Sequence, residues 1–300
     1  MIDVQSEPDG RGIHIDSVGI RDVRYPITVY EGPEPQRTIA TAAISVRVPD
    51  DVRGTHLSRL VEILDTYAAH IDAASISSLL DSLCGRLDAQ SASADLTFTY
   101  STRRAAPVTG ASACATFEAL FSGSKDRYHE TISMGIQVPV TTVCPCSKAI
   151  SDYGAHNQRG TVTIEVALNQ QLDGQYPTFA ALIEIAEASA SAPVYPLVKR
   201  PDERFLTMKA FDHPLFVEDV IRGCSLELQL LAGADSFRVE VTTQESIHSH
   251  NAFASIGWSP TDATTARNSG RTEQLVQPMG ERFRSAMQPF RAQPRALTDY

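Results

Sequence analysis

Two kinds of apolar periodicity alternate along this chain. Residues 14–30 and 38–49 carry Ile, Val and Tyr at alternate positions, which is typical of β-strands. Residues 55–71 and 76–87 repeat Leu, Ile and Val at intervals of three and four, which predicts two amphipathic helices. Three further strand-like runs follow, at residues 96–104, 113–123 and 128–140. The first half is therefore expected to be strands, then two helices, then strands.

The second half shows the same order of patterns. The predicted elements are a strand, a helix, a second helix and a strand, at residues 161–169, 179–191, 213–233 and 236–249. Pro214 suits the first turn of the helix over 213–233, and Gly233 suits its C-terminal end. No residue-level repeat accompanies this order, so the duplication concerns the elements alone.

These patterns predict an α+β fold built from two similar modules. We expect a flexible arm over residues 1–13, a first module over 14–157, a second module over 158–258, and a flexible tail over 259–300. The tail is assigned because its first part is polar and short of large apolar residues, as flexible linkers are.

Composition and charge narrow the functional classes. The chain has 300 residues, of which 42% are apolar and 21% charged, and its net charge is −10. A duplex nucleic acid would be repelled by this charge unless basic residues gathered on one face, and no basic stripe is visible. No apolar run approaches the roughly 18 residues that span a bilayer, and the N-terminus lacks a secretory pattern. We expect a cytoplasmic protein without nucleic-acid or membrane partners.

The cysteines fall into two groups. Five are present, and an odd count in a cytoplasmic protein argues against a disulfide framework. Cys84, Cys114 and Cys224 lie in apolar-periodic contexts and are expected in the core. Cys144 and Cys146 need a different account.

Residues 140–160 hold the most informative pattern, since Cys144, Cys146 and His156 lie within 13 positions. Thiolate and imidazole are preferred ligands of zinc and related transition metals. Pro145 stiffens the backbone between the two thiols, so one ligand and one reactive thiol are easier to build than two sulfurs on one ion. Three interpretations stay open at this point: small core cysteines with a surface histidine, a structural zinc site, and a catalytic site. The structural-zinc interpretation is weakened because the sequence has no second paired cysteine motif.

Two other segments carry candidate chemistry. Glu245, His248 and His250 follow an apolar strand pattern and suit acid–base work or support of metal ligands, the alternative being two solvated histidines. Residues 197–205 contain Lys199, Arg200 and Glu203, which are either a charged surface turn or groups that meet a polyphosphate and a metal. Glu218 lies among apolar residues and either binds a ligand or complements a helix N-terminus.

Four segments together resemble GTP cyclohydrolase I of the type IB family: CPCSKAISDYGAHNQRG, KRPDE, FVED and ESIHSHNA. The likeness runs over roughly residues 15–257. It implies the tunnelling fold with two modules per chain, and a homotetramer with active sites at subunit interfaces. It also implies the reaction of GTP and water to 7,8-dihydroneopterin triphosphate and formate.

The resemblance assigns roles residue by residue. Cys144 and His156 match metal ligands, with Glu203 as the third, and the ion would be zinc, manganese or iron. Cys146 matches a second thiol needed for catalysis, and Glu218 matches the anchor of the guanine edge. The group beside the reacting centre is Glu245, His248 and His250. The cations expected to meet the triphosphate are Lys148, Arg159, Lys199 and Arg200.

The chemistry is consistent with these roles. Guanine C8 is a poor electrophile, so a metal ion is expected to assist attack by water, and three protein ligands leave a coordination position for it. Two alternatives remain: a related tunnelling-fold enzyme with a different pterin or purine product, and a non-catalytic zinc- or nucleotide-binding protein.

Overall fold

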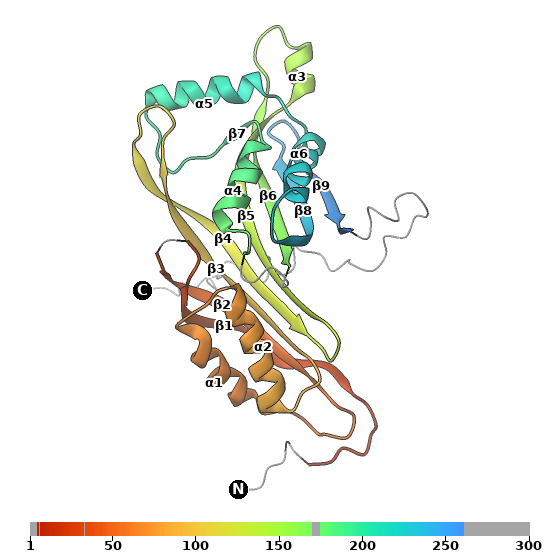
Figure 1. Ribbon diagram of the computed structural model, residues 1–300. Helices are drawn as coiled ribbons and strands as arrows, with labels where there is room; N and C mark the ends of the chain where they lie inside the picture. Colours follow the sequence, from red (N-terminus) through yellow and green to blue (C-terminus); the bar gives the residue numbers. More distant parts are fainter. Residues whose placement is uncertain (1–4, 6, 33, 170–174, 261–300) are drawn as a thin grey trace, which may run out of the picture.

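One antiparallel sheet extends through the whole described part of the chain. The computed structural model describes residues 5, 7–32, 34–169 and 175–260. In spatial order the strands are β1 (Ile15–Val29), β2 (Gln36–Val48), β3 (Ala92–Ala105), β4 (Ser112–Lys125), β5 (Glu130–Val143), β6 (Asn157–Leu168), β8 (Ala234–Gln244) and β9 (Asn251–Trp258), and the short β7 (Ala192–Pro193) pairs with β5. Each strand pairs with its neighbour in antiparallel register (Figure 1).

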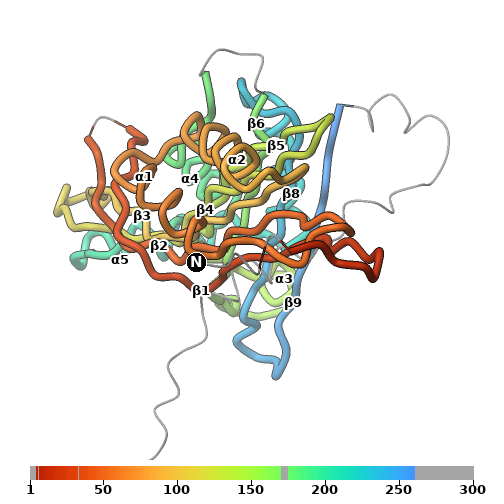
Figure 2. The backbone as a smooth tube through the Cα atoms, turned by 90° about the horizontal axis from the view of Figure 1, so that it is seen from below, coloured from red at the N-terminus to blue at the C-terminus, as the bar shows by residue number. Residues whose placement is uncertain are grey.

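The helices lie mainly on one face of this sheet. They are α1 (Leu57–Ala68), α2 (Ala73–Leu87), α3 (Pro145–Ile150), α4 (Phe179–Ala188), α5 (Arg200–Asp212) and α6 (Val217–Gln229). Figure 2 shows α1, α2 and α4 on the same side of the strands. Because strand side chains alternate between faces, one face of the sheet packs against the helices and forms the main core cluster. A small second cluster of Val143, Ala192 and Ala210 lies where β5, β7 and α5 meet. The α+β class predicted from the sequence is confirmed.

Phe179, at the start of α4, ties the two halves of the sheet together. Its fully buried ring lies 6.0, 5.1 and 5.3 Å from the ring centroids of Phe98, Tyr100 and Phe121, which belong to β3 and β4. Such aromatic contacts add to the free energy of area burial. The core is thus continuous between the halves.

The order of elements repeats along the chain. Two strands, two helices and two strands occur as β1–β2–α1–α2–β3–β4 and again as β5–β6–α4–α6–β8–β9. The second set also contains α3, β7 and α5, so it is longer. The sheet and the core run unbroken past residue 157, and the module boundaries at 14–157 and 158–258 remain a prediction.

The region after β7 differs from the sequence prediction. The expected helix over 213–233 is wrong at both ends, because α6 runs from Val217 to Gln229, so Pro214 lies before it and Gly233 lies beyond its end. The helix α5 was not predicted, because its charged residues resembled a surface turn. Pro201 in its first turn, followed by two acidic residues, is nevertheless a helix-start signal. The last expected strand ends at Gln244, and β9 follows as an unpredicted strand.

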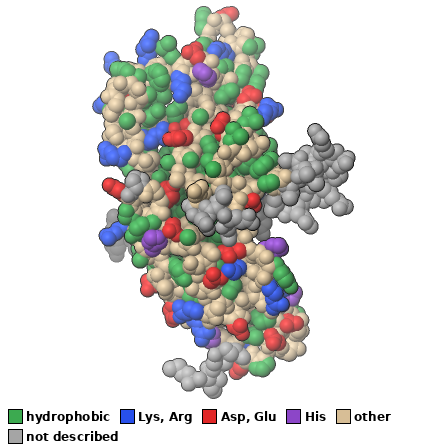
Figure 3. Space-filling view, in the orientation of Figure 1, with side chains coloured by type: hydrophobic (Ala, Val, Ile, Leu, Met, Phe, Trp, Pro, Cys, Tyr) green, Lys and Arg blue, Asp and Glu red, His purple; other side chains and the backbone are tan. Residues whose placement is uncertain are grey.

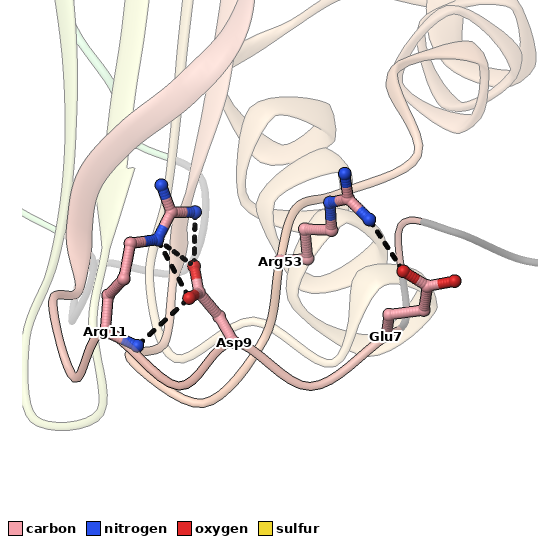
Figure 4. A network of polar contacts seen from close by, with 4 residues as sticks. All are labelled: Glu7, Asp9, Arg11 and Arg53. Carbon is pink, nitrogen blue, oxygen red and sulfur yellow. Dashed lines mark hydrogen bonds and ion pairs between the residues drawn. The ribbon is translucent and has the colours of Figure 1, made fainter.

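The N-terminal segment is held against the loop after β2. Pro8 forms an isolated β-bridge with Val52, and Arg53 Nη1 donates to Glu7 Oε2 at 2.6 Å. Asp9 accepts three bonds from the Arg11 guanidinium (Figure 4), which lowers the pKa of Asp9 to about 2. The expected arm is therefore paired with this loop through Gln5, Glu7, Pro8 and Asp9. The expected tail falls almost entirely on residues 261–300, outside the described residues.

Candidate active site

Cys144 and His156 meet where β5 ends and β6 begins. The Cys144 N–H donates to the carbonyl oxygen of His156 at 3.1 Å, which continues the ladder past the pair Val143–Asn157. The residues between them form the short helix α3 and a turn, so the chain leaves the sheet and returns to the same place. Two candidate donors twelve positions apart in sequence thereby become neighbours, as the metal-site interpretation requires.

Ser147 fixes the geometry of this turn. Its Oγ donates to the Cys144 carbonyl at 3.1 Å and accepts from the His156 N–H at 3.1 Å. The Ser147 N–H in turn donates to Cys144 Sγ at 3.4 Å, so the thiol caps the N-terminus of α3. The sulfur of Cys144 thus already accepts one backbone N–H, and cysteine sulfur is a common metal donor.

The imidazole of His156 contacts one side chain from β6 and one from the loop between β8 and β9. Its Nδ1 lies 2.9 Å from Gln158 Oε1 and 3.4 Å from Ser246 Oγ. Gln158 Nε2 donates to Thr142 Oγ1 at 3.0 Å. Sequence reasoning missed Gln158 and Ser246, although residues two apart on a strand share a face and so mark Gln158 as a neighbour of His156.

The segment with Glu245, His248 and His250 is the loop between β8 and β9. Thr243 Oγ1 donates to Glu245 Oε1 at 2.7 Å, and Ser246 reaches His156, so the loop lies against the Cys144–His156 turn. The rings of His248 and His250 stack with centroids 5.1 Å apart. The prediction that the two histidines face the same side is therefore confirmed, although they lie on an exposed loop and not on a strand.

The KRPDE segment begins α5, and its buried member is Asp202. Asp202 is 0% exposed and accepts from the N–H groups of Val108, Thr109 and Lys199 at 2.9, 3.0 and 2.9 Å, and from the Thr109 hydroxyl at 2.6 Å. Burial raises the pKa of Asp202, but these four hydrogen bonds outweigh it and hold the pKa well below its usual range. The carboxylate thus fastens the start of α5 to the β3–β4 hairpin. Sequence reasoning did not single it out.

The third predicted metal ligand stands apart from the first two. Glu203 is exposed in the first turn of α5, whereas only the opposite end of that helix reaches α3, through Lys148 and Phe211. Within the described residues, no three His, Cys, Asp or Glu side chains are placed to share a metal ion. A single chain therefore brings Cys144 and His156 together without Glu203, and the metal-ligand roles of all three residues stay predictions.

The remaining predicted residues surround this end of the sheet. Cys146 is exposed on α3, and Glu218 is exposed in the first turn of α6, where a carboxylate complements the helix N-terminus. Lys148 donates to the Phe211 carbonyl and lies 4.1 Å from the centroid of that ring. Of the four cations expected to meet the triphosphate, the other three, Arg159, Lys199 and Arg200, are exposed.

The other three cysteines differ in burial. Cys224 is buried in α6 and Cys84 is half-buried in α2. Cys114 is exposed, so the expectation that it lies in the core is wrong. The reason is strand alternation: Ala115 and Phe117 on β4 face the helices, and Cys114 points to the other side.

Comparison with known proteins decides the family. The family model described as type I GTP cyclohydrolase folE2 matches residues 1–254. The chain belongs to this family. A member from Syntrophobacter fumaroxidans, named GTP cyclohydrolase FolE2, is 42% identical over 259 residues, covering 85% of this chain and 98% of its own length. Another from Methylobacillus flagellatus, with the same name, is 41% identical over 255 residues, covering 85% and 94%.

The fold of this GTP cyclohydrolase family member is the tunnelling fold. The crystal structure of uricase from Arthrobacter globiformis superposes with a TM-score of 0.51, covering 88% of this chain and 96% of the uricase chain. The sequences are only 8% identical, so the likeness concerns the fold alone. An antiparallel sheet with helices on one face is common to both, as expected from the sequence.

Proposed function

We propose that this protein converts GTP and water into 7,8-dihydroneopterin triphosphate and formate, at a site built around Cys144, Cys146 and His156. The observation that carries the proposal is the family match over residues 1–254, together with relatives named GTP cyclohydrolase at about 41–42% identity. The structure adds that Cys144 and His156 are adjacent although they are twelve positions apart in the sequence. The chain is an enzyme of the GTP cyclohydrolase I type.

The residue types at this turn are ones that bind divalent metal ions. Cys144 has a thiol that accepts a backbone N–H, and His156 has one ring nitrogen engaged by Gln158, which is the arrangement common to metal-bound histidines. We assign Cys144 and His156 as ligands and Glu203 as the third, brought close by a second copy of the chain or by movement of α5. When bound, the ion would activate water toward guanine C8. Zinc, manganese and iron are the candidate metals.

Proton transfer is assigned to the loop between β8 and β9. Ring opening and loss of formate need groups that donate and accept protons, and a neutral imidazole does both. His248 and His250 lie on the loop that contacts His156 through Ser246, with Glu245 anchored by Thr243. Cys146, exposed two residues after Cys144, supplies the second thiol.

Substrate binding is assigned to exposed charges around the same end of the sheet. Glu218 would accept hydrogen bonds from the guanine edge, and the cations would meet the triphosphate. The assigned cations are Lys148, Arg159, Lys199 and Arg200. Lys148 would have to exchange its hydrogen bond to Phe211 for one to phosphate.

Assembly is part of the same proposal. Helix α5 exposes Phe205, Met208 and Phe211 by 43%, 47% and 38%, an apolar stripe at helical spacing beside the candidate site. A second copy covering this stripe would complete a site that one chain leaves with two donors. A homotetramer with active sites at its interfaces is therefore proposed.

A cytoplasmic location, without nucleic-acid or membrane partners, is also proposed. In the described residues, none of the helices is both long and apolar enough to cross a membrane. Figure 3 shows Lys and Arg side chains interspersed with Asp and Glu side chains over the visible face, in keeping with the net charge of −10.

The test is turnover of GTP by the purified protein across a metal series. Formate is measured directly, and the pterin is measured by fluorescence after oxidation and identified by mass. Formate release with the mass of dihydroneopterin triphosphate supports the proposal. A different pterin or purine mass supports a related tunnelling-fold enzyme, and a fully loaded protein without any turnover supports a binding protein.

Single cysteine-to-alanine substitutions distinguish the thiols of the proposed site from an exposed thiol elsewhere in the protein. Cys146→Ala is expected to abolish turnover while the fold is kept, and Cys144→Ala is expected to lose metal as well. Cys114→Ala is the matched control, because Cys114 is also exposed but lies on β4, where no candidate residue stands. Equal loss of activity in the Cys114 and Cys146 variants would contradict the assignment.

A further inference from the structure

A chain of side-chain hydrogen bonds runs from the interior of the sheet to the imidazole of His156. It starts at Thr142, which is only 1% exposed on β5. Gln158 on β6 donates from Nε2 to Thr142 Oγ1 at 3.0 Å and presents Oε1 to His156 Nδ1 at 2.9 Å. Thr142 and Gln158 are cross-strand partners in the ladder, so the backbone itself sets their spacing.

The two ends of the Gln158 amide are not equivalent. Its NH2 group can only donate and its oxygen can only accept, so an amide nitrogen placed on Thr142 Oγ1 leaves an acceptor facing the histidine. A neutral imidazole then satisfies that acceptor by carrying its proton on Nδ1. The remaining ring nitrogen, Nε2, keeps its electron pair.

We propose that Gln158, whose NH2 group lies on Thr142, is a positioning residue that holds His156 in the tautomer protonated at Nδ1 and so makes Nε2 the donor to a divalent metal ion. The inference rests on the proposed function for the ligand role of His156. Metal-bound histidines usually donate their second N–H to an oxygen, which fixes the ring and raises its basicity as a ligand.

The opposite orientation of the amide makes the opposite prediction. If Gln158 turned its NH2 group toward Nδ1, the imidazole proton would lie on Nε2, and that atom would not bind a metal. Ser246 Oγ, at 3.4 Å from Nδ1, is a more distant partner and does not set the tautomer by itself. The two orientations can be distinguished by replacing the amide with a group that only accepts hydrogen bonds, or with a group that neither donates nor accepts them.

The experiment compares Gln158→Glu with Gln158→Leu in the full-length, metal-free protein. Nitrogen NMR of the imidazole, with His156 assigned by its absence in His156→Asn, reports which ring nitrogen carries the proton. The wild type and Gln158→Glu are expected to carry it on Nδ1, because a carboxylate accepts from Nδ1–H and from the Thr142 hydroxyl. Gln158→Leu is expected to lose this preference.

Zinc affinity, measured by chelator competition, gives the second readout. Gln158→Leu is expected to bind zinc about 10- to 100-fold more weakly, as for loss of other groups that orient a ligand. Gln158→Glu is expected to keep or exceed the wild-type affinity. Thr142→Val, which releases the amide without removing it, is expected to weaken binding by less than Gln158→Leu does.

Gln137→Leu is the matched control, since Gln137 is also half-buried and lies on β5 beside β6. It should leave zinc affinity and the imidazole signals unchanged. A wild-type proton on Nε2, or a Gln158→Glu variant as weak as Gln158→Leu, overturns the proposal. Failure of the proposed function is seen separately, as absent GTP turnover by protein whose tautomer and zinc affinity are as expected.

Discussion

The two halves of the sheet have the same order of elements but different content. In the first, α1 and α2 follow one another with four residues between them, and α2 starts with a complete capping box at Asp72 and Ser75. In the second, the additions α3, β7 and α5 interrupt the order. The candidate residues lie on or beside these additions and on the β8–β9 loop, at the end of the sheet seen at the top of Figure 1.

With the proposed site residues, the first half would act as scaffold and the second half would carry the chemistry. Binding and catalytic residues are often placed on connections that a rigid framework positions. Here the framework is the β5–β6 pair, which brings Cys144 and His156 together, and the additions present the charged groups around them. Substitutions in the two halves should therefore affect different quantities.

The largest effect is expected where the halves meet. Phe179→Ala removes a fully buried ring that contacts Phe98, Tyr100 and Phe121, and is expected to lower the free energy of unfolding by about 3–5 kcal/mol. Denaturant unfolding followed by two probes measures this loss. If the loss is below about 1 kcal/mol, the halves are stable independently and the single core is not what joins them.

Cys146→Ala is expected to change activity and not stability. Because Cys146 is exposed, the free energy of unfolding should move by less than about 0.5 kcal/mol. Its kcat should fall by more than about 100-fold, the range expected for a group that takes part in proton transfer. Steady-state kinetics with GTP and thermal melting are measured side by side. A stability loss that accounts for the missing activity would make Cys146 structural.

Asp72→Ala tests the scaffold role of the first half. Asp72 Oδ1 accepts from the Ser75 N–H at 2.7 Å at the start of α2, so its loss should cost about 1 kcal/mol of stability. Activity per folded molecule should not change, because no candidate residue lies on α1 or α2. A changed KM for GTP at constant folded fraction would show that the first half takes part in the reaction.

Glu31→Gln tests the contact between the halves from which we expect the smallest effect. Glu31, in the β1–β2 loop, accepts from the Phe179 N–H at 2.7 Å. Burial raises the pKa of Glu31, and this hydrogen bond offsets only part of the rise. The folded state therefore favours the protonated acid, and this group destabilises the wild type as pH rises through its unfolded value near 4.5 and on through the higher folded value.

The amide introduced by Glu31→Gln can still accept the Phe179 N–H but does not ionise. The variant is expected to gain stability relative to the wild type between about pH 4 and pH 7, and to match it more closely at the acid end. Urea unfolding at several pH values measures the difference. A constant difference across this range would mean that Glu31 does not titrate differently on folding.

Several elements could be predicted from apolar periodicity, and others could not. The strands of the first half and the helices α1 and α2 follow clear patterns, because each buries one face against the core. Helix α5 escaped prediction because only two of its residues are buried, one of them the charged Asp202. Strand β9 was not predicted, because the strand predicted over residues 236–249 included the histidine-rich loop.

The candidate site shows the same division. Cys144, His156 and the histidines of the β8–β9 loop could be selected by residue type and spacing, because metal ligands and proton carriers come from few residue types. Gln158 and Asp202 could not, since their importance comes from the partners they contact: Thr142 and His156 for one, the β3–β4 hairpin for the other. Thr142 and His156 lie close to Gln158 in the chain, whereas Val108 and Thr109 lie far in sequence from Asp202.

By itself, the sequence determined the alternating pattern that forms the strands, the amphipathic helices, and the presence of two thiols and an imidazole in one segment. Only the tertiary structure decided that the ends of β5 and β6 bring Cys144 and His156 together, that Glu203 stands away from them within one chain, and that Cys114 faces solvent. The physical reason is that periodicity encodes which face of an element is buried. Long-range pairing of strands and the packing of additions depend on contacts between residues far apart in the chain.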